Sequence, residues 1–288
     1  MKHSHFLITL FNLALWPADK SNSPTRTEQW LDSRCRLFEQ WCLPSVMAQK
    51  GASFRWLVMF DADSPASLRE RIARWQRLCP ALEPCFFTAA QVQGFAGRSV
   101  DRQVDFIVSA IKERLDGSEE WLLTTNLDND DALASDALSR ISEAFMRNPA
   151  LGVISLVNGL QLFPSLGVAA KMSYPHNHFL TLCEPLGPDA TPLTVESMSH
   201  RRARKMFPVT DLKGDPGWIE VVHGCNISND LRITSRIRYR YPLSAISLRP
   251  FGIDLLISRS RQLRALPAFA AMMLRVASRR LLRKLRKH

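Results

Sequence analysis

Several features that mark whole classes of protein are missing from this sequence. No stretch approaches the roughly 20 consecutive apolar residues of a membrane-spanning helix, so no such helix is expected. The six cysteines form no C-x-x-C pair, which argues against a zinc or redox motif and favours reduced thiols in or near the core. The 12 glycines and 17 prolines follow no period, which excludes collagen-like and low-complexity chains. What remains is a chain of 288 residues, 46% of them hydrophobic, that can bury the core of one large domain or two small ones.

Acidic residues are missing from one end of the chain. Between Arg259 and His288 there are ten Lys and Arg residues and no Asp or Glu, whereas the first 258 residues carry 28 basic and 27 acidic side chains. Nearly all of the formal net charge of +11 therefore belongs to residues 258–288, here called the basic tail. The rest of the chain is close to neutral, which weakens the case for a nucleic-acid-binding body.

The basic tail also carries apolar residues at helical spacing. Pro267 can open a helix in which Phe269 and Met272 share one side, while Leu281 and Leu285 share nearly the opposite side. Two short amphipathic pieces with clustered Arg and Lys predict attachment to an anionic membrane surface. A partly disordered tail without a partner and a tail that binds nucleic acid or another partner are the alternatives.

Short apolar runs alternate with helical patterns over the first 150 residues. Runs bounded by loop or turn residues predict strands over residues 6–11, 56–60, 85–88 and 121–125. Between and after them, helices are expected to begin after Thr25 or Thr27, at Pro65, near Val100 and after Ser135. This alternation predicts an α/β fold, with a mostly parallel sheet and helices on both faces.

The first apolar run also resembles part of a signal peptide, because Lys2 precedes it and it extends to Trp16. However, Asn12 interrupts the run and no small-residue cleavage site follows it. A buried strand is therefore the preferred interpretation.

The pattern changes after Pro149. The pair Asn158-Gly159 lies between two β-forming runs and predicts a hairpin. The stretch from Pro175 to Pro216 predicts long loops with one helix near residues 196–206, and long loops on a rigid sheet commonly carry binding residues. We therefore expect one domain over residues 1–257, with a nucleotide-binding half at 1–150 and a hairpin- and loop-rich acceptor-side half at 151–257, followed by the basic tail at 258–288.

The segment that indicates chemistry is Asp128-Asn129-Asp130-Asp131, here called the acidic segment. Three carboxylates within four residues repel one another where a buried strand ends, so a cation or hydrogen-bond donors must compensate them. Hard oxygen ligands at this density suit Mg²⁺ or Mn²⁺, ions that combine carboxylates with substrate phosphates. The alternative is an acidic cap on the next helix.

Three chemistries use acidic residues at a strand end. A calcium loop requires Gly at its sixth position, where this sequence has Leu133, and is rejected. An aspartyl-phosphate phosphatase requires its D-x-D soon after a first strand, whereas here three earlier strand candidates precede the strand that leads into the motif. The third is a nucleotide-diphosphate sugar transferase, whose D-x-D holds a metal against the diphosphate.

Several segments in order resemble one family. They are "HFLITLFNLALW", "LPSVMAQ", "WLVMFDADSP", "TTNLDNDDAL" and "GDPGWIEVVHGCNIS". Together, over about residues 3–230, they resemble the putative rhamnosyltransferases, a bacterial family similar to GT-A glycosyltransferases. The resemblance implies a GT-A-like fold and metal-dependent transfer of a sugar, rhamnose by the family's label, from a nucleotide-diphosphate donor. Leu10 and Asn126 depart from the pattern, because Arg is expected at both positions, and this leaves the donor less certain than the fold.

The resemblance also implies roles for residues near the metal. Asp130 is the first choice as metal ligand, and Asp128 is expected to face the donor or to share the metal. Asp131 is the second choice, both as a metal ligand and as a residue that faces the donor. His223 is expected to complete the metal shell or touch the diphosphate, as a late His does in several GT-A enzymes; a structural histidine is the alternative.

Other residues are candidates for binding the donor and activating the acceptor. Asp61, at the end of a predicted strand, can accept from a uracil or thymine imide, and Arg102 can pair with the diphosphate; a turn Asp and a solvated Arg are the alternatives. Asn226 can hydrogen-bond the donor. Asp215 is the predicted base for the acceptor hydroxyl, with Asp211 and Glu184 behind it, although an Asp before Pro216 is also ordinary in a turn. The candidates are therefore catalytic Asp215, donor-binding Asp61, Arg102, Asp128, Asp131 and Asn226, and metal-binding Asp128, Asp130 and His223.

The expected activity is transfer to a glycan or lipid-linked acceptor at the cytoplasmic face of the cell membrane. Two rival functions follow from the same residues. A noncatalytic protein could keep the fold and its acidic loop, and the departures at Leu10 and Asn126 favour this rival. A basic nucleic-acid-binding protein would interleave aromatics with cations, yet Phe269 is the sole aromatic residue of the basic tail, so no nucleic acid is expected.

Overall fold

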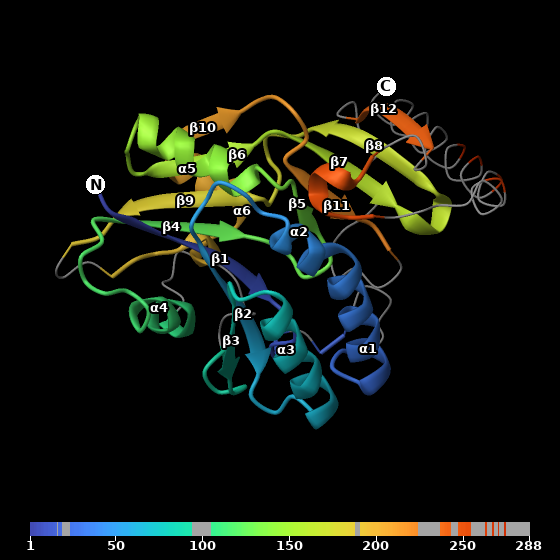
Figure 1. Cartoon of the computed structure of the whole chain (residues 1–288), viewed down its shortest axis with the longest axis horizontal. Coiled ribbons are helices and arrows are strands. Elements are labelled where there is room, and N and C mark those ends of the chain that lie inside the picture. Colours follow the sequence, from blue (N-terminus) through green and yellow to red (C-terminus); the bar gives the residue numbers. More distant parts are fainter. Residues whose placement is uncertain are drawn as a thin grey trace, which may run out of the picture.

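Two β-sheets form the framework of the computed structural model, and helices cover the larger one (Figure 1). The structure describes residues 1–15, 17–18, 24–93, 105–187, 191–223, 237–242 and 247–254, together with Leu263, Pro267, Ala270 and Leu274. The larger sheet has seven strands in the order β10-β6-β9-β4-β1-β2-β3, and the smaller has five in the order β12-β8-β7-β11-β5.

The strands of the larger sheet are β1 (His3–Leu10), β2 (Arg55–Asp61), β3 (Leu82–Phe87), β4 (Trp121–Asn126), β6 (Gly152–Leu156), β9 (Leu180–Pro185) and β10 (Val209–Leu212). Those of the smaller sheet are β5 (Ala132–Leu133), β7 (Asn158–Phe163), β8 (Val168–Ser173), β11 (Trp218–Val221) and β12 (Ile237–Pro242). The α-helices are α1 (Glu28–Leu37), α2 (Leu43–Met47), α3 (Ala66–Leu78), α4 (Asp105–Lys112), α5 (Ala137–Arg147) and α6 (His200–Met206). Single turns are the π-helical η1 (Phe38–Cys42) and the 3₁₀ turns η2 (Pro164–Leu166), η3 (Val195–Ser197) and η5 (Arg249–Phe251).

The larger sheet is mostly parallel, as predicted. Strands β4, β1, β2 and β3 run parallel to one another, and β6 runs parallel to β10, whereas β9 is antiparallel to both β4 and β6. The predicted strands at 6–11, 56–60, 85–88 and 121–125 correspond to β1, β2, β3 and β4. The α/β fold class is therefore confirmed.

The first strand lies in the interior of this sheet. Phe6, Leu7 and Ile8 of β1 are fully buried, and β1 pairs with β2 on one side and β4 on the other. A continuous apolar run fits this place, because both faces of a parallel strand are covered. The prediction of a buried strand at the start of the chain is confirmed.

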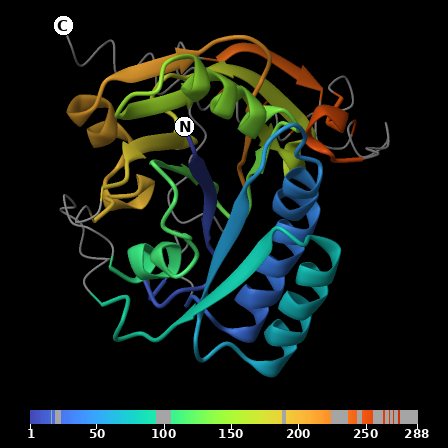
Figure 2. The ribbon, with the colours of Figure 1, turned by 60° about the vertical axis from the view of Figure 1, so that its left-hand side comes forward.

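Helices cover both faces of the larger sheet. One hydrophobic cluster joins the sheet to α1, α2, α3 and α5, and a second joins its other face to α4 and α6. Figure 2 shows α1 and α3 on one side of strands β1 to β3 and α4 on the other. Helix α1 begins at the predicted cap, because the Thr27 hydroxyl accepts from Trp30 N–H at 3.3 Å.

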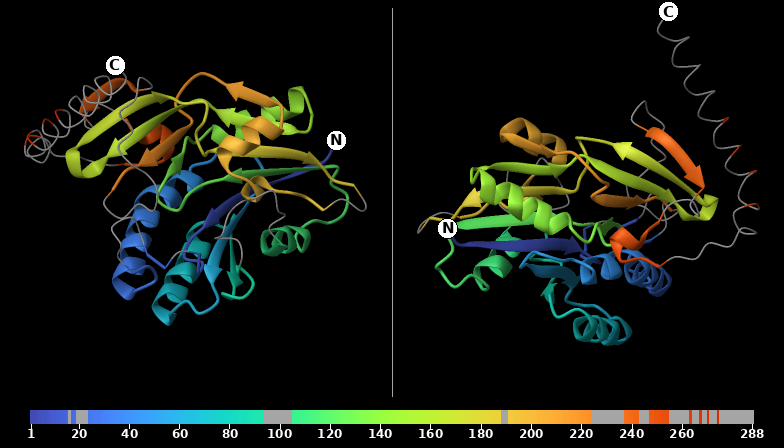
Figure 3. Two further views of the ribbon diagram at one scale, coloured as in Figure 1. Left: turned by 180° about the vertical axis from the view of Figure 1, so that it is seen from behind. Right: turned by 45° about the horizontal axis from the view of Figure 1, so that its top comes forward.

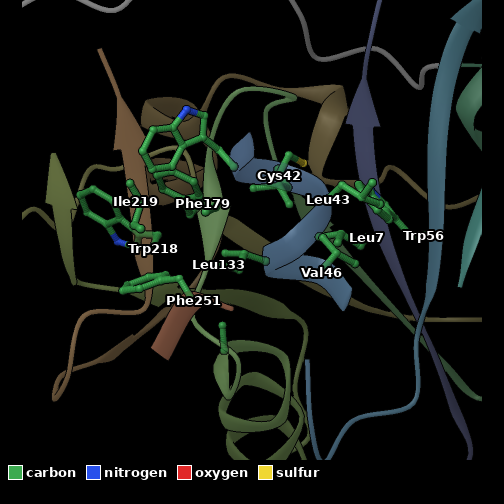
Figure 4. Packing of buried hydrophobic residues seen from close by; sticks show 14 of the residues in the cluster. Leu7, Cys42, Leu43, Val46, Trp56, Leu133, Phe179, Trp218, Ile219 and Phe251 are labelled. Carbon is green, nitrogen blue, oxygen red and sulfur yellow. The ribbon is translucent and has the colours of Figure 1, made fainter. Parts of the chain in front are cut away.

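The core continues from the larger sheet into the smaller one (Figure 4). Leu43 of α2 lies between Trp56 of the larger sheet and Leu133 of the smaller one in this view. Trp218 of β11 stacks on Phe179 with ring centroids 4.9 Å apart. The two sheets therefore share one apolar core.

The predicted hairpin at Asn158-Gly159 is wrong. Gly159 lies inside β7 rather than in a turn. A glycine is needed at this position because the ring of Trp218 packs directly against it and would collide with a side chain there. The hairpin of this half joins β7 to β8 instead, through η2 and Gly167, whose φ of 60° suits glycine. β6 and β7 belong to different sheets.

Most of the basic tail lies outside the described residues, as does the start of the helix predicted near Val100. The four described tail residues are helical and exposed, and Leu263 and Leu274 are 65% and 71% exposed. Both views of Figure 3 show strands β7, β8 and β12 of the smaller sheet at the end of the molecule away from the N-terminus. Among the described residues, no helix has the length and apolar character needed to cross a bilayer. Five of the six cysteines are described, and these are buried free thiols.

Candidate functional site

The carboxyl ends of β1, β2 and β4 meet at one edge of the larger sheet. Asp61 ends β2, and the acidic segment follows β4 directly. β1 lies between these two strands, so their ends are about 10 Å apart at the usual strand spacing. The fold therefore brings together two groups of acidic residues that are 67 positions apart in the chain.

The acidic segment connects the two sheets. Leu127 is fully buried and its N–H donates to the Ile8 carbonyl at 3.0 Å, which extends the pairing beyond β4. The Asp131 N–H then donates to the Asp128 carbonyl at 3.2 Å and closes a turn, after which the chain enters β5 of the smaller sheet. The turn leaves the Asp128 side chain 50% exposed and buries those of Asp130 and Asp131.

Asp130 lies in a buried ion pair. Its Oδ2 accepts from Arg34 Nη1 at 2.8 Å and lies 2.8 Å from His223 Nε2. The Arg34 and Asp130 side chains are only 5% and 8% exposed. Burial raises the pKa of Asp130, but Arg34 and His223 outweigh it and hold that pKa at about 2. Asp130 is therefore a carboxylate at neutral pH.

Asn129 fixes the same region to the end of β1. Its amide donates to the carbonyls of Leu10 and Phe11 at 3.0 and 2.9 Å, and its oxygen accepts from Arg34 at 3.2 Å. Position 10 has Leu where the family pattern has Arg. Arg34 of α1 nevertheless places a guanidinium at the same edge of the sheet.

Asp131 forms a second pair, with His178. One Asp131 oxygen accepts from Val221 N–H at 2.8 Å and the other lies 2.9 Å from His178 Nε2. His178 Nε2 is also 3.6 Å from Asp128 Oδ2. Burial lowers the pKa of His178, but the charge of Asp128 and the hydrogen bond to Asp131 raise it to about 10.

The residues around the acidic segment fit a divalent metal. One ligand atom each from Asp128, Asp131 and His178 lies within 4.8 Å of the others, and the exposure of Asp128 leaves a side open to a substrate. Two carboxylates and an imidazole are ligands that Mn²⁺ accepts readily, whereas Mg²⁺ prefers oxygen alone. The predicted ligands Asp130 and His223 are also adjacent.

Sequence reasoning missed Arg34 and His178. Arg34 could have been found, because it shares helical spacing with Leu31, Cys35 and Phe38, and a charged residue on a buried stripe needs a partner. His178 lies in the connection from β8 to β9, and nothing local links it to an acidic segment 47 residues earlier.

Asp61 is buried and held on several sides. Its backbone N–H donates to the Asn12 side chain at 3.1 Å, and its Oδ1 accepts from Asp63 N–H at 2.9 Å. Its Oδ2 accepts from Arg26 Nη1 at 3.2 Å. Arg26 has a φ of 64°, a left-handed conformation that is uncommon for a non-glycine residue. The buried carboxylate is therefore held by several hydrogen bonds, and its partner Arg26 is itself 42% exposed.

The other predicted residues lie in different places. Asp215 is exposed in the turn between β10 and β11, at the same edge but three strands from β4, on the order of 15 Å by strand spacing. Its carbonyl accepts from Arg140 at 3.2 Å. Asp211 pairs with Arg204, and Glu184 accepts from Leu193 and Thr194 N–H groups at the opposite end of β4.

Arg102 and Asn226 lie outside the described residues, so their predicted roles stay predictions. Asn126, the second departure from the family pattern, donates to the His178 carbonyl at 3.3 Å. This contact helps to hold the β8–β9 connection against the end of β4.

Comparison with known proteins identifies the family. A family model described as "Putative rhamnosyl transferase" matches residues 20–235, which is three quarters of the chain. Among curated proteins, no sequence matches significantly.

Solved structures with a similar fold have low sequence identity. S. aureus TarS (residues 1–349), in complex with UDP-GlcNAc, is 12% identical with a TM-score of 0.43, covering 79% of this chain and 60% of TarS. A protein described as a putative nucleotide-diphospho-sugar transferase from Desulfovibrio desulfuricans G20 is 10% identical with a TM-score of 0.36, covering 77% of this chain and 82% of that one. The chain thus spans less than two thirds of the TarS fragment, and at these TM-scores the likenesses support no inference about function.

Proposed function

Because this chain belongs to the family of putative rhamnosyl transferases, we propose that it transfers a sugar from a nucleotide-diphosphate donor to a glycan or lipid-linked acceptor. The observation that supports this most directly is the carboxyl edge of the larger sheet, where Asp61 and the acidic segment flank the end of β1. Ligands of open α/β sheets bind at such an edge. Rhamnose is the sugar that the family name suggests.

The nucleoside is proposed to lie on the β2 side of the edge and the diphosphate on the β4 side. Asp61 presents an ordered carboxylate that can accept from the imide N–H of uracil or thymine in exchange for Arg26. The acidic segment, about 10 Å away at two strand spacings, then lies within reach of the diphosphate.

A divalent cation, Mn²⁺ or Mg²⁺, is proposed at the acidic segment. When bound, it would neutralise the charge that grows on the departing nucleoside diphosphate. Asp128 lies close to Asp131 and His178, which makes these three the ligand set that the geometry favours. Asp130 with His223 is the alternative pair, so two histidines are candidates for the imidazole ligand. The protein groups orient the ligands: Val221 N–H fixes Asp131, and Arg34 fixes Asp130.

The acceptor hydroxyl must lose a proton if the transfer inverts the sugar. Asp215 is the proposed base: its side chain is exposed, and within the described residues it makes no side-chain hydrogen bond. Arg102 and Asn226 are proposed to contact the donor. We further propose that the basic tail holds the protein on the cytoplasmic face of the membrane, where a lipid-linked acceptor would be present.

A panel of UDP- and dTDP-sugars tests the proposed function. With Mn²⁺ present, one donor should raise the melting temperature of the full-length chain, because a ligand that binds the folded state stabilises it by mass action. The same donor should release its nucleoside diphosphate slowly in water and faster with acceptor. A rise in melting temperature without turnover would identify a noncatalytic nucleotide-sugar-binding protein. No rise with any donor would contradict both this function and the proposed transferase.

Variants then test the assigned roles. Asp215→Asn should lower turnover 10²- to 10⁴-fold, the usual worth of a general base, and leave the donor-induced shift unchanged. His178→Gln and His223→Gln form a matched pair: the one that weakens Mn²⁺ binding supplies the imidazole ligand.

A further inference from the structure

A buried arginine lies against the acidic segment from a helix on one face of the larger sheet. Arg34 Nη1 contacts Asp130 Oδ2 at 2.8 Å and Asn129 Oδ1 at 3.2 Å, and its side chain is 5% exposed. Its guanidinium carbon is 5.2 Å from the centre of the Trp30 ring, which covers it. A full positive charge is therefore fixed against Asp130, within the acidic segment.

The place of Arg34 on α1 leaves it little freedom to move away. Leu31 and Cys35 on the same helix face are buried in the main core, which anchors α1 against the sheet. The planar guanidinium contacts two acceptors from one fixed position, whereas a lysine ammonium would lie on a more flexible side chain. Asn129, one of those acceptors, is itself held by the carbonyls of Leu10 and Phe11.

A fixed cation changes how strongly this segment attracts a metal. Without it, three carboxylates would be a strong site for any divalent ion. With it, one carboxylate is already compensated, and the incoming dication is repelled by a charge that water screens poorly at this depth. A nucleotide diphosphate brings negative charges of its own and restores the attraction.

We propose that Arg34 is a built-in counter-ion that weakens metal binding to the empty acidic segment, so that the divalent ion and the diphosphate bind together. This rests on the proposed function, because it concerns the same metal and donor. It makes Arg34 a positioning residue that acts through Asp130 and Asn129, and it holds whichever histidine completes the metal shell.

Mn²⁺ titration of the full-length chain without nucleotide tests this, with free Mn²⁺ followed by its paramagnetic resonance signal. Arg34→Gln should raise the affinity for Mn²⁺ at least fivefold and reduce the gain in affinity that UDP or dTDP brings. Arg34→Lys, which keeps the charge, should stay within twofold of the parent chain. Arg36→Gln is the matched control, because Arg36 lies on the same helix but is 68% exposed and pairs with Asp32.

An unchanged or lower Mn²⁺ affinity in Arg34→Gln would overturn the proposal. If that variant does not fold, the comparison moves to Asp130→Asn against Arg34→Gln/Asp130→Asn, in which two amides can hydrogen-bond and no charge is left unpaired. The double variant should again bind Mn²⁺ at least fivefold more tightly than the single one, and equal affinities would reject the counter-ion role. Because the titration needs no donor sugar, its result is independent of whether any donor in the panel is turned over.

Discussion

At the scale of single residues, the buried His5 makes the stability of the protein depend on pH. Its Nε2 lies 2.7 Å from the Thr125 hydroxyl, and burial lowers the pKa of His5 to about 3 from an ordinary value of 6.5. The folded chain therefore keeps His5 neutral while the unfolded chain takes up a proton below pH 6.5. Stability must fall as the pH drops from 6.5 toward 3, by about 2 kcal/mol from this group between pH 7 and pH 5.

Chemical denaturation at pH 7 and pH 5 measures this effect. His5→Gln, which cannot titrate, serves as the control and should lose about 2 kcal/mol less than the parent chain over the same pH step. The comparison isolates His5 from other titrating groups, including the partly buried His3, whose pKa burial also lowers. Equal losses in the two proteins would show that His5 does not stay neutral in the folded state.

Asp61 allows a second prediction at this scale, on donor binding. Asp61→Asn should weaken UDP binding about 10- to 100-fold, because the neutral amide oxygen is a weaker acceptor than a carboxylate, and a hydrogen bond to a charged group contributes about 1.5–3 kcal/mol. Asp63→Asn is the control, since Asp63 is exposed two residues later and uses its backbone N–H to hold Asp61. Isothermal titration of both variants with UDP gives the comparison, and equal affinities would remove Asp61 from the nucleotide site.

At the scale of elements, Gly159 shows how two strands of the smaller sheet are fitted together. A Cβ at this position would lie 2.1 Å from the Trp218 ring, which is buried and stacked on Phe179. Gly159→Ala should therefore cost about 3 kcal/mol of unfolding free energy, the upper part of the range for overpacking. In a double-mutant cycle with Trp218→Leu, the cost of the alanine should fall below about 1 kcal/mol, and additive costs would contradict the packing.

The same element marks the limit of what local sequence could predict. Strands β1 to β4 and the Thr27 cap were predictable, because apolar runs and capping residues act within a few positions. The hairpin at Asn158-Gly159 was wrong, since the reason for Gly159 is a ring 59 residues further on. For the site, the strand-end positions of Asp61, Asp128 and Asp130 followed from the pattern.

The partners of those acids did not follow from local sequence. Arg34 reaches Asp130 across 96 positions, and His178 reaches Asp131 across 47. Such pairs depend on how α1 and the β8–β9 connection pack against the end of β4. For Arg34, its position on the buried face of α1 was a usable signal, whereas nothing near His178 in the sequence indicated its partner.

At the scale of the whole molecule, the charge is separated between a nearly neutral body and the basic tail. Removing residues 259–288 takes away ten positive charges and leaves the remainder at +1. Each cation near an anionic surface contributes about 1 kcal/mol, so the truncated protein should no longer sediment with vesicles that contain phosphatidylserine at low salt. Vesicles of phosphatidylcholine alone are the control, and unchanged sedimentation after truncation would show that the tail is not the attachment.

The chain crosses between the two sheets where its candidate residues lie: the acidic segment links β4 to β5, His178 lies between β8 and β9, and Asp215 lies between β10 and β11. The candidate residues thus lie on the connections that join the two sheets. A ligand bound to these connections would restrain the two sheets relative to each other. Amide hydrogen exchange should then slow in β5 and β11 when UDP and Mn²⁺ bind, well beyond the residues that touch them.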